Sequence, residues 1–390
     1  MSSPYDVLET AFILAASAGE QPLVTDHTML RSIRFVVECQ SNQSGRRFLM
    51  ACCLAKLLSP NIDIRKPYTE IGTQDAYSGR DIDQTYILSF ATSHRLPVNV
   101  TTAFLTPAYR NRDAALTPDV TVVGRPKQLY VEILQLLDHV YRGRLAPQDL
   151  LAEVMRQLIE MRMARDARMA MLLAAVEPEA GALPLSSEGI VELLDQHLRS
   201  SKASRLPVLI VTAAYQAASN ALQEAPLPLY AHNAADSQTR SLGDIQIVLT
   251  NDSQVVSAYE MKDKEVRLDD VEIALAKVLS NEARPDNYIL ITTKPILKEV
   301  TDYAASLYAQ TGTEFAVLDC IGFIRHFLHL FHRLRLKFLN TYQTLVLAEP
   351  ESAVGQPLKE VFLSLRQLAE FNLNQAQDQH AHQDTLGLEG

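Results

Sequence analysis

Apolar residues recur at three- and four-residue spacing over most of the first half of the chain, which is the period of an amphipathic helix. Between the predicted helices at 44–58 and 128–142, proline and glycine interrupt the pattern, and we expect one helix in that stretch, near 81–94. Residues 1–200 are therefore predicted to form a mainly helical region. The other predicted helices lie at 5–19, 27–39, 44–58, 128–142, 147–176 and 186–200.

The pattern changes after residue 205. Residues 206–222 are rich in alanine and predict a buried helix. Segments 245–250 and 255–262 are rich in β-branched residues and flank Asn-Asp-Ser at 251–253, which has the composition of a turn. Together these segments predict a β-hairpin.

Further along, two short apolar segments, 288–292 and 314–318, are separated by a predicted helix at 296–310, and another helix is expected at 269–281. Two strands joined through a helix predict a parallel crossover. The sequence thus predicts an α/β (α+β) fold with a mixed-sheet core. The core is expected at 201–320, C-terminal helices at 321–374, and a disordered tail rich in Gln, Asp and His at 375–390.

Composition narrows the class of protein. The 390-residue chain carries a net charge of −10, which argues against a protein that coats nucleic acid nonspecifically, because such binding needs a broad basic surface. No apolar run reaches the roughly 18 to 20 residues that span a bilayer, so we expect no membrane partner. The four cysteines form no CxxC pair, and no secretory signal is evident. A reducing, cytoplasmic location is expected.

One group of charged residues lies on the predicted hairpin. Because strand side chains alternate faces, Glu260 and Lys262 point the same way, at the end of a stripe that is otherwise apolar. Asp244 precedes the first strand of the hairpin, so the turn brings it back near Glu260. Two carboxylates can hold Mg²⁺, and a lysine beside them can stabilise a phosphate transition state. Spacing alone fits a cross-strand salt bridge on a surface hairpin equally well.

The order of elements around these residues resembles the αβββαβ core of the PD-(D/E)XK nucleases. The departure is that Gly243, where the motif often has proline, precedes Asp244. A second segment begins like the same motif, with Asp119 followed by Glu132, but Leu134 stands in the lysine position and the segment after 128 is predicted to be helical. We interpret that second segment as structural.

Residues 64–127 are dense in polar and charged side chains, in particular the segments 65–71, 77–83 and 101–112. Together with the Gly-Asp and Tyr-Glu-Met-Lys-Asp strings within 243–263, they resemble the SacI-type family of type II restriction endonucleases. The resemblance implies a Mg²⁺-dependent enzyme that cuts both strands of double-stranded DNA at a short sequence and is usually accompanied by a DNA methyltransferase. Its catalytic residues would be Asp244, Glu260 and Lys262, with the metal held by the two carboxylates.

The same segment supplies candidates for DNA contact. Arginine reads guanine and asparagine reads adenine in the major groove, and an aspartate can orient an arginine or accept from cytosine. The candidates are Arg80, Asp81, Arg110, Asn111 and Arg112, with Asp83 as a further orienting carboxylate. The plainer interpretation of each residue is a solvated ion pair on a loop. Long irregular segments of this composition are often binding loops, which favours DNA contact.

His326, His329 and His332 recur every three residues among basic side chains. Zinc-binding pairs on a helix usually lie four apart, so we predict a basic helix face that touches phosphate or packs on a partner.

The sequence predicts a type II restriction endonuclease, and a homodimer is expected because a two-fold axis matches a palindromic site. Two alternatives remain open: another PD-(D/E)XK-fold DNA nuclease, acting in repair or on modified DNA, or a noncatalytic interaction protein with a degenerate nuclease core.

Overall fold

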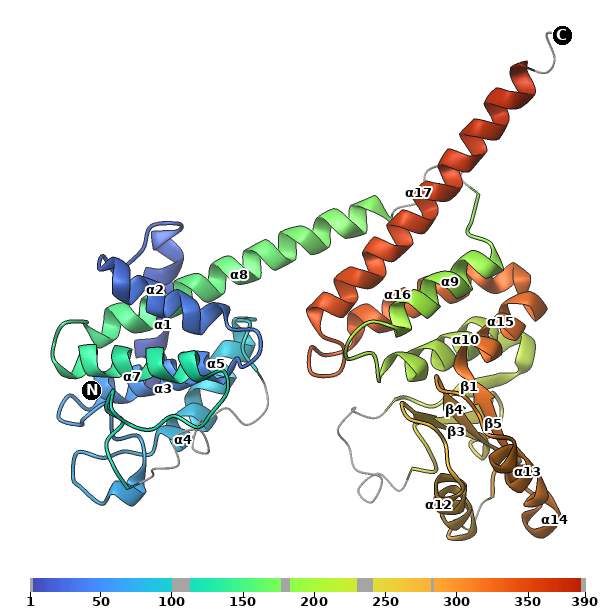
Figure 1. The fold of residues 1–390 in the computed structure, drawn as a ribbon, viewed down its shortest axis with the longest axis horizontal. Coiled ribbons are helices and arrows are strands. Elements are labelled where there is room, and N and C mark those ends of the chain that lie inside the picture. The colour runs from blue at the N-terminus through green and yellow to red at the C-terminus, as the bar shows by residue number, and fades with distance from the viewer. Residues whose placement is uncertain (1–2, 100–112, 177–182, 230–240, 282–283, 387–390) are drawn as a thin grey trace. The chain divides into compact units, whose positions relative to one another are not determined.

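Helices form where apolar residues recur with the helical period. The computed structural model describes residues 3–99, 113–176, 183–229, 241–281 and 284–386, and it divides into two units, Met1–Met169 and Ala170–Gly390 (Figure 1). The predicted mainly helical region, 1–200, extends past this division, since residues 170–200 belong to the second unit. No helix in the described part of the chain is long and apolar enough to cross a membrane.

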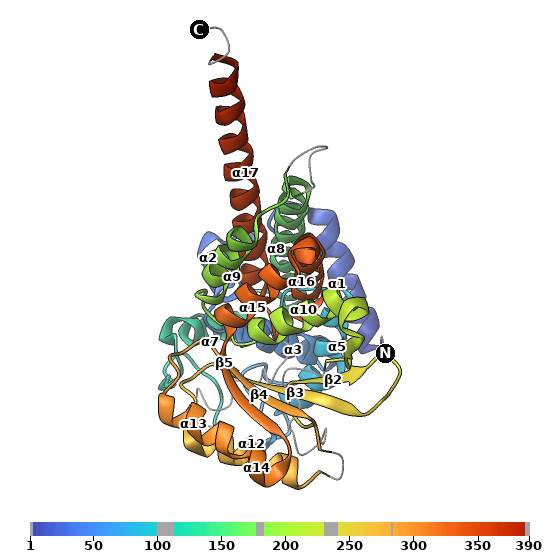
Figure 2. The same cartoon turned by 90° about the vertical axis from the view of Figure 1, so that its right-hand side faces the viewer.

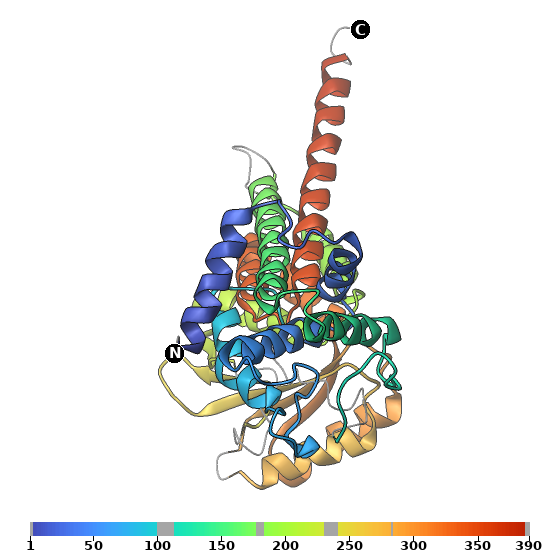
Figure 3. The ribbon, with the colours of Figure 1, turned by 90° about the vertical axis from the view of Figure 1, so that its left-hand side faces the viewer.

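The first unit is helical and is organised around helix α3. The residues of α3 from Ser44 to Ala55 are all buried, and the helix packs against α1, α2 and α7 (Figure 3). The burial includes Arg47, whose guanidinium pairs with Asp83 at 2.7 Å. The α-helices of this unit are α1 (Pro4–Ala18), α2 (His27–Glu38), α3 (Ser44–Leu58), α4 (Gly79–Ile82), α5 (Leu88–Ser93), α7 (Lys127–Tyr141) and α8 (Pro147–Ala175), the last of which continues into the second unit.

The second unit contains a mixed five-stranded sheet in the order β1-β2-β3-β4-β5 (Figure 2). Strand β2 runs antiparallel to both β1 and β3, and β3, β4 and β5 run parallel. The predicted hairpin and the predicted parallel crossover are therefore both present. The strands are β1 (Glu224–Pro226), β2 (Ile245–Leu249), β3 (Val255–Lys262), β4 (Asn287–Thr292) and β5 (Glu314–Asp319).

Helices cover both faces of this sheet (Figure 1). One face packs against α12 (Leu268–Leu279) and α13 (Lys298–Ser306), through a core that includes Ala258 and Tyr288. On the other face Tyr259 contacts Tyr215 of α10 (Leu206–Leu222) and Phe323 of α15 (Cys320–Leu330). Alternate residues of β3 thus belong to different cores. The remaining helices are α9 (Ser187–Leu198), α14 (Tyr308–Thr311), α16 (Arg335–Ala348) and α17 (Gln356–Leu386).

Three local features differ from the predicted elements. The short strand β1 was missed because Glu-Ala-Pro lacks β-branched residues, although an edge strand tolerates its proline. The region 321–374, predicted as C-terminal helices, has a break near its start, where α15 ends at Leu330 and α16 begins at Arg335. Helix α17 continues through 375–386, where a disordered tail was expected, because Gln and Ala there are compatible with a continuing helix.

His197 joins three helices inside the second unit. Its ring nitrogens lie 3.0 Å from the Tyr342 hydroxyl of α16 and 3.0 Å from the Leu358 carbonyl of α17. The side chain is fully buried, and this burial lowers its pKa to about 4, although the hydrogen bond to the carbonyl opposes the shift. The folded protein therefore holds His197 neutral at pH 7.

A lowered histidine pKa makes stability depend on pH. The unfolded chain takes up the proton near the ordinary pKa of 6.5, and the folded chain does so only near 4. The stabilisation is complete above pH 6.5 and is lost as pH falls toward 4, by about 3 kcal/mol. We expect urea unfolding to show this loss in the parent protein. In His197→Gln, the loss of unfolding free energy between pH 6.5 and 4 should be smaller by about 3 kcal/mol. Equal losses in the two proteins would show that His197 does not cause the pH dependence.

Candidate functional site

Asp244 and Glu260 lie side by side at one end of the β2–β3 hairpin. Ile245 pairs with Tyr259 in the antiparallel register, and continuing the register by one residue puts Asp244 opposite Glu260. Asp244 Oδ2 also accepts a hydrogen bond from the backbone N–H of Met261 at 2.7 Å. The carboxylate of Asp244 is therefore fixed to β3, one residue from Glu260, while its side chain stays exposed.

Gly243 allows this close approach of the two strands. A Cβ atom built at position 243 would lie 2.5 Å from the carbonyl oxygen of Tyr259 and 3.0 Å from its carbonyl carbon. The obstacle is backbone, which cannot rotate away as a side chain can. The glycine before Asp244 is thus required by local packing, and proline, which also carries a Cβ, would meet the same oxygen.

Glu260 is the centre of a dense group of hydrogen bonds. Lys262 Nζ donates to Oε1 at 2.9 Å, and Lys277 Nζ donates to Oε2 at 2.8 Å. The hydroxyl of Tyr288 also donates to Oε2, at 2.7 Å. Burial alone would raise the pKa of Glu260, but the three donors outweigh it and hold the pKa at about 2. Glu260 is therefore an anion throughout the neutral range.

Asp270 adds a second buried carboxylate to the group. It lies 3.6 Å from Lys262 and 3.3 Å from Lys264, and it caps the start of α12 by accepting from the Arg267 N–H. These contacts outweigh its burial and lower its pKa. The carboxylates of Asp244, Glu260 and Asp270 and the ammonium groups of Lys262, Lys264 and Lys277 thus lie at this end of the sheet.

The donor set fits a hard divalent cation. Among the described residues, no group of three or more His, Cys, Asp or Glu side chains could hold a metal ion, so the chain offers a pair of carboxylates, Asp244 and Glu260. Mg²⁺ keeps several waters and is commonly held by one or two carboxylates together with substrate phosphate. Oε2 of Glu260 accepts from both Lys277 and Tyr288, which uses both of its lone pairs, so a metal that binds this oxygen has to displace a donor.

Lys277 and Tyr288 were not among the residues selected from the sequence. Lys277 follows Asp270 by seven residues and Ala274 by three, so it lies along the stripe of α12 that faces the sheet. Tyr288 pairs with Ala258 in the parallel register, which puts it diagonal to Glu260 on the same face. Two features of the sequence could have identified these residues: Lys277 is a lysine on a buried helical stripe, and Tyr288 is a tyrosine within an apolar strand.

The candidates for DNA contact lie apart from this group in the chain. Arg80 and Asp81 are exposed on α4 of the first unit. Asp83, proposed as an orienting carboxylate, is instead buried against Arg47, so that proposal was wrong. Arg110, Asn111 and Arg112 lie outside the residues that the structure describes.

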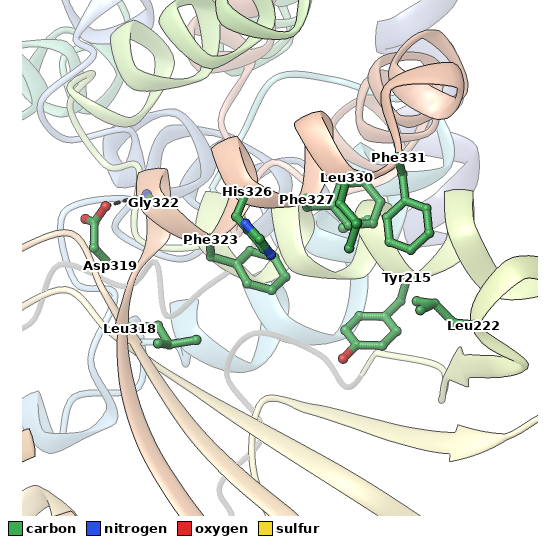
Figure 4. Close-up of a pocket in the computed structure, with 11 residues that line it drawn as sticks. Tyr215, Leu222, Leu318, Asp319, Gly322, Phe323, His326, Phe327, Leu330 and Phe331 are labelled. Carbon is green, nitrogen blue, oxygen red and sulfur yellow. Dashed lines mark hydrogen bonds between the residues drawn. The ribbon is translucent and has the colours of Figure 1, made fainter.

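His326 and His329 lie on α15 and have different surroundings, and His332 lies in the short 3-10 helix His332–Leu334. His329 lies 2.8 Å from Glu188, which also pairs with Arg325. His326 borders a cavity of about 440 Å³ whose walls are mainly apolar and aromatic (Figure 4). The cavity is on the Tyr259 side of the sheet, because Tyr215, another wall residue, bonds to the Tyr259 hydroxyl at 2.8 Å. It is therefore separate from the Glu260 group.

Comparison with known families bears on the same stretch of chain. Residues 184–292 match the family model of the SacI restriction endonuclease C-terminal domain. A search of curated protein sequences finds no match. The matched segment runs from just before α9 to the end of β4, so it contains every residue of the Glu260 group. The match supports a restriction endonuclease, hence a nuclease that binds DNA.

The close contact at Gly243 generates a prediction for stability. Gly243→Ala forces β2 away from the Tyr259 carbonyl and strains the hydrogen bond between Asp244 and Met261. We expect a loss of about 1–3 kcal/mol in the free energy of unfolding, measured in urea. Gly355→Ala is the matched control, since its new Cβ would meet nothing closer than 3.8 Å. Equal stability of the two variants would contradict the packing argument.

Proposed function

We propose that this protein is a type II restriction endonuclease that hydrolyses phosphodiester bonds in both strands of DNA at a short, fixed sequence. The observation that carries the proposal is the pairing of Asp244 with Glu260, with Lys262 on the same carboxylate, within the segment that matches a restriction endonuclease domain. An ordinary cross-strand salt bridge would not require a second carboxylate opposite the first or a glycine at 243.

Each residue has a role in the proposed chemistry. Asp244 and Glu260 would hold a divalent cation; the strand register places both carboxylates at this end of the hairpin, and Glu260 is ionised. Mg²⁺, when bound there, would supply a Lewis acid that acidifies a water molecule and offsets charge on the phosphate. Lys262 sits beside the carboxylates and stabilises the added negative charge of the phosphorus transition state. Its hydrogen bond to Glu260 orients it for that task.

The element order also supports membership of the PD-(D/E)XK superfamily. Among the residues that the structure describes, helix α10, strands β1, β2 and β3, helix α12 and strand β4 come in the αβββαβ order that this superfamily has. The two carboxylates and the lysine occupy the end of the hairpin in that sequence, as the resemblance implies. We propose that Gly243 replaces the proline of the motif for the packing reason given above.

DNA recognition is proposed to involve the first unit. Arg80 and Asp81 project from α4 into solvent, and Arg110, Asn111 and Arg112 carry the side chains that read guanine and adenine. A homodimer on a palindromic site, a partner DNA methyltransferase and a cytoplasmic location complete the proposal. A methyltransferase is expected because a cell that makes such an enzyme has to protect its own recognition sites.

Lys262→Ala should abolish most DNA cleavage. Removing the cation beside the reacting phosphate is expected to slow cleavage about 100-fold or more. The measurement is digestion of phage DNA with purified protein and Mg²⁺, followed by gel electrophoresis. Lys298→Ala is the control, because Lys298 is an exposed lysine of α13 paired with Asp302, and it should cut like the parent.

The pattern of fragments separates the proposed activity from its alternatives. Discrete fragments support site-specific cleavage, and a smear indicates a nonspecific or modification-dependent nuclease. Absence of cleavage by the parent protein favours an interaction protein with an inactive core. A Lys262→Ala protein that cuts as well as the parent would remove Lys262 from the catalytic group.

A further inference from the structure

Lys277 comes from a different element than the other charged groups around Glu260. It belongs to α12, whereas Lys262 lies two residues from Glu260 on the same strand. The two lysines divide the carboxylate between them, Lys262 on Oε1 and Lys277 on Oε2. Since Lys262 has a role toward the phosphate in the proposed chemistry, the second ammonium needs a separate explanation.

Tyr288 already orients the oxygen that Lys277 contacts. Its hydroxyl donates to Oε2 at 2.7 Å, its side chain is fully buried, and its ring stacks on Phe315 with centroids 5.7 Å apart. A tyrosine held in this way cannot move out of the core. The position of Oε2 is therefore fixed without Lys277, and what Lys277 adds is chiefly a positive charge.

Lys277 is placed so that it can leave. Its side chain is 20% exposed, and its ammonium sits on a flexible four-carbon stem that can reach water. A divalent cation that binds Oε2 competes there with this ammonium, because Lys277 and Tyr288 already use both lone pairs of that oxygen. Repulsion between the two cations then favours release of Lys277 into solvent.

We infer that Lys277 is a positioning residue that acts as a displaceable counter-ion, neutralising Glu260 in the metal-free protein and yielding Oε2 to the metal. The inference rests on the proposed metal site at Asp244 and Glu260. Its consequence is that the wild-type protein binds metal more weakly than its carboxylates alone would allow. The ammonium keeps the buried carboxylate stable until metal arrives.

The test measures metal binding without DNA. Mn²⁺ is titrated into the full-length protein, and unbound Mn²⁺ is followed by electron paramagnetic resonance. Lys277→Met keeps an unbranched stem and removes the charge, and we expect it to bind Mn²⁺ about 10-fold more tightly, the equivalent of one charge-assisted hydrogen bond. Lys298→Met, which removes an exposed lysine of α13, should leave the affinity unchanged.

The opposite result is equally clear. If Lys277 were only a structural ion pair, Lys277→Met would lower the melting temperature in EDTA and leave Mn²⁺ affinity unchanged or weaker, and that outcome overturns the inference. If Lys277→Met does not fold, Lys277→Gln, which keeps an uncharged donor, is judged by the same criterion. Equal Mn²⁺ binding by the parent and Glu260→Gln would instead overturn the proposed metal site itself, and the inference with it.

Discussion

The burial of the Glu260 carboxylate is the constraint around which the sheet end is built. An anion on a largely apolar face of a sheet is unfavourable unless cations and hydrogen-bond donors replace the water it loses. Three elements supply those donors: β3 through Lys262, α12 through Lys277 and β4 through Tyr288. The Glu260 carboxylate thus links β3 to α12 through Lys277 and to β4 through Tyr288. The same carboxylate takes part in the proposed chemistry.

The sequence predicts this arrangement as far as local patterns extend. β-Branched runs around a turn define the hairpin, and the alternation of strand residues puts Glu260 and Lys262 on one face. Local patterns do not predict Lys277 and Tyr288 as partners of Glu260, because both contact it only through tertiary packing. Lys277 lies 17 residues and Tyr288 28 residues after Glu260 in the chain, so no local pattern links either residue to it. Strand β1 was not predicted for a different reason: it is a strand because it pairs with β2, and its composition does not indicate one.

In the first unit, local composition does not distinguish exposed charged residues from buried ones. Asp81 and Asp83 are two residues apart in a segment that looks uniformly polar, yet Asp81 is exposed and Asp83 is buried beside Arg47. Arg47 comes from α3, 36 residues earlier in the chain, so no local pattern identifies the pair. Charged side chains in such a segment serve either packing or binding, and only the partner on a distant helix decides which.

The donors around Glu260 come from three elements that are synthesised one after another: β3, α12 and β4. While the ribosome has completed the hairpin but not β4, Glu260 has Lys262 beside it and lacks the hydroxyl of Tyr288. The full set of donors to this carboxylate exists only after β4 has been added beside β3. A chain interrupted before residue 288 carries Asp244, Glu260 and Lys262 without the packing that holds them. An unfinished copy therefore has the three proposed catalytic residues but only part of the site that orients them.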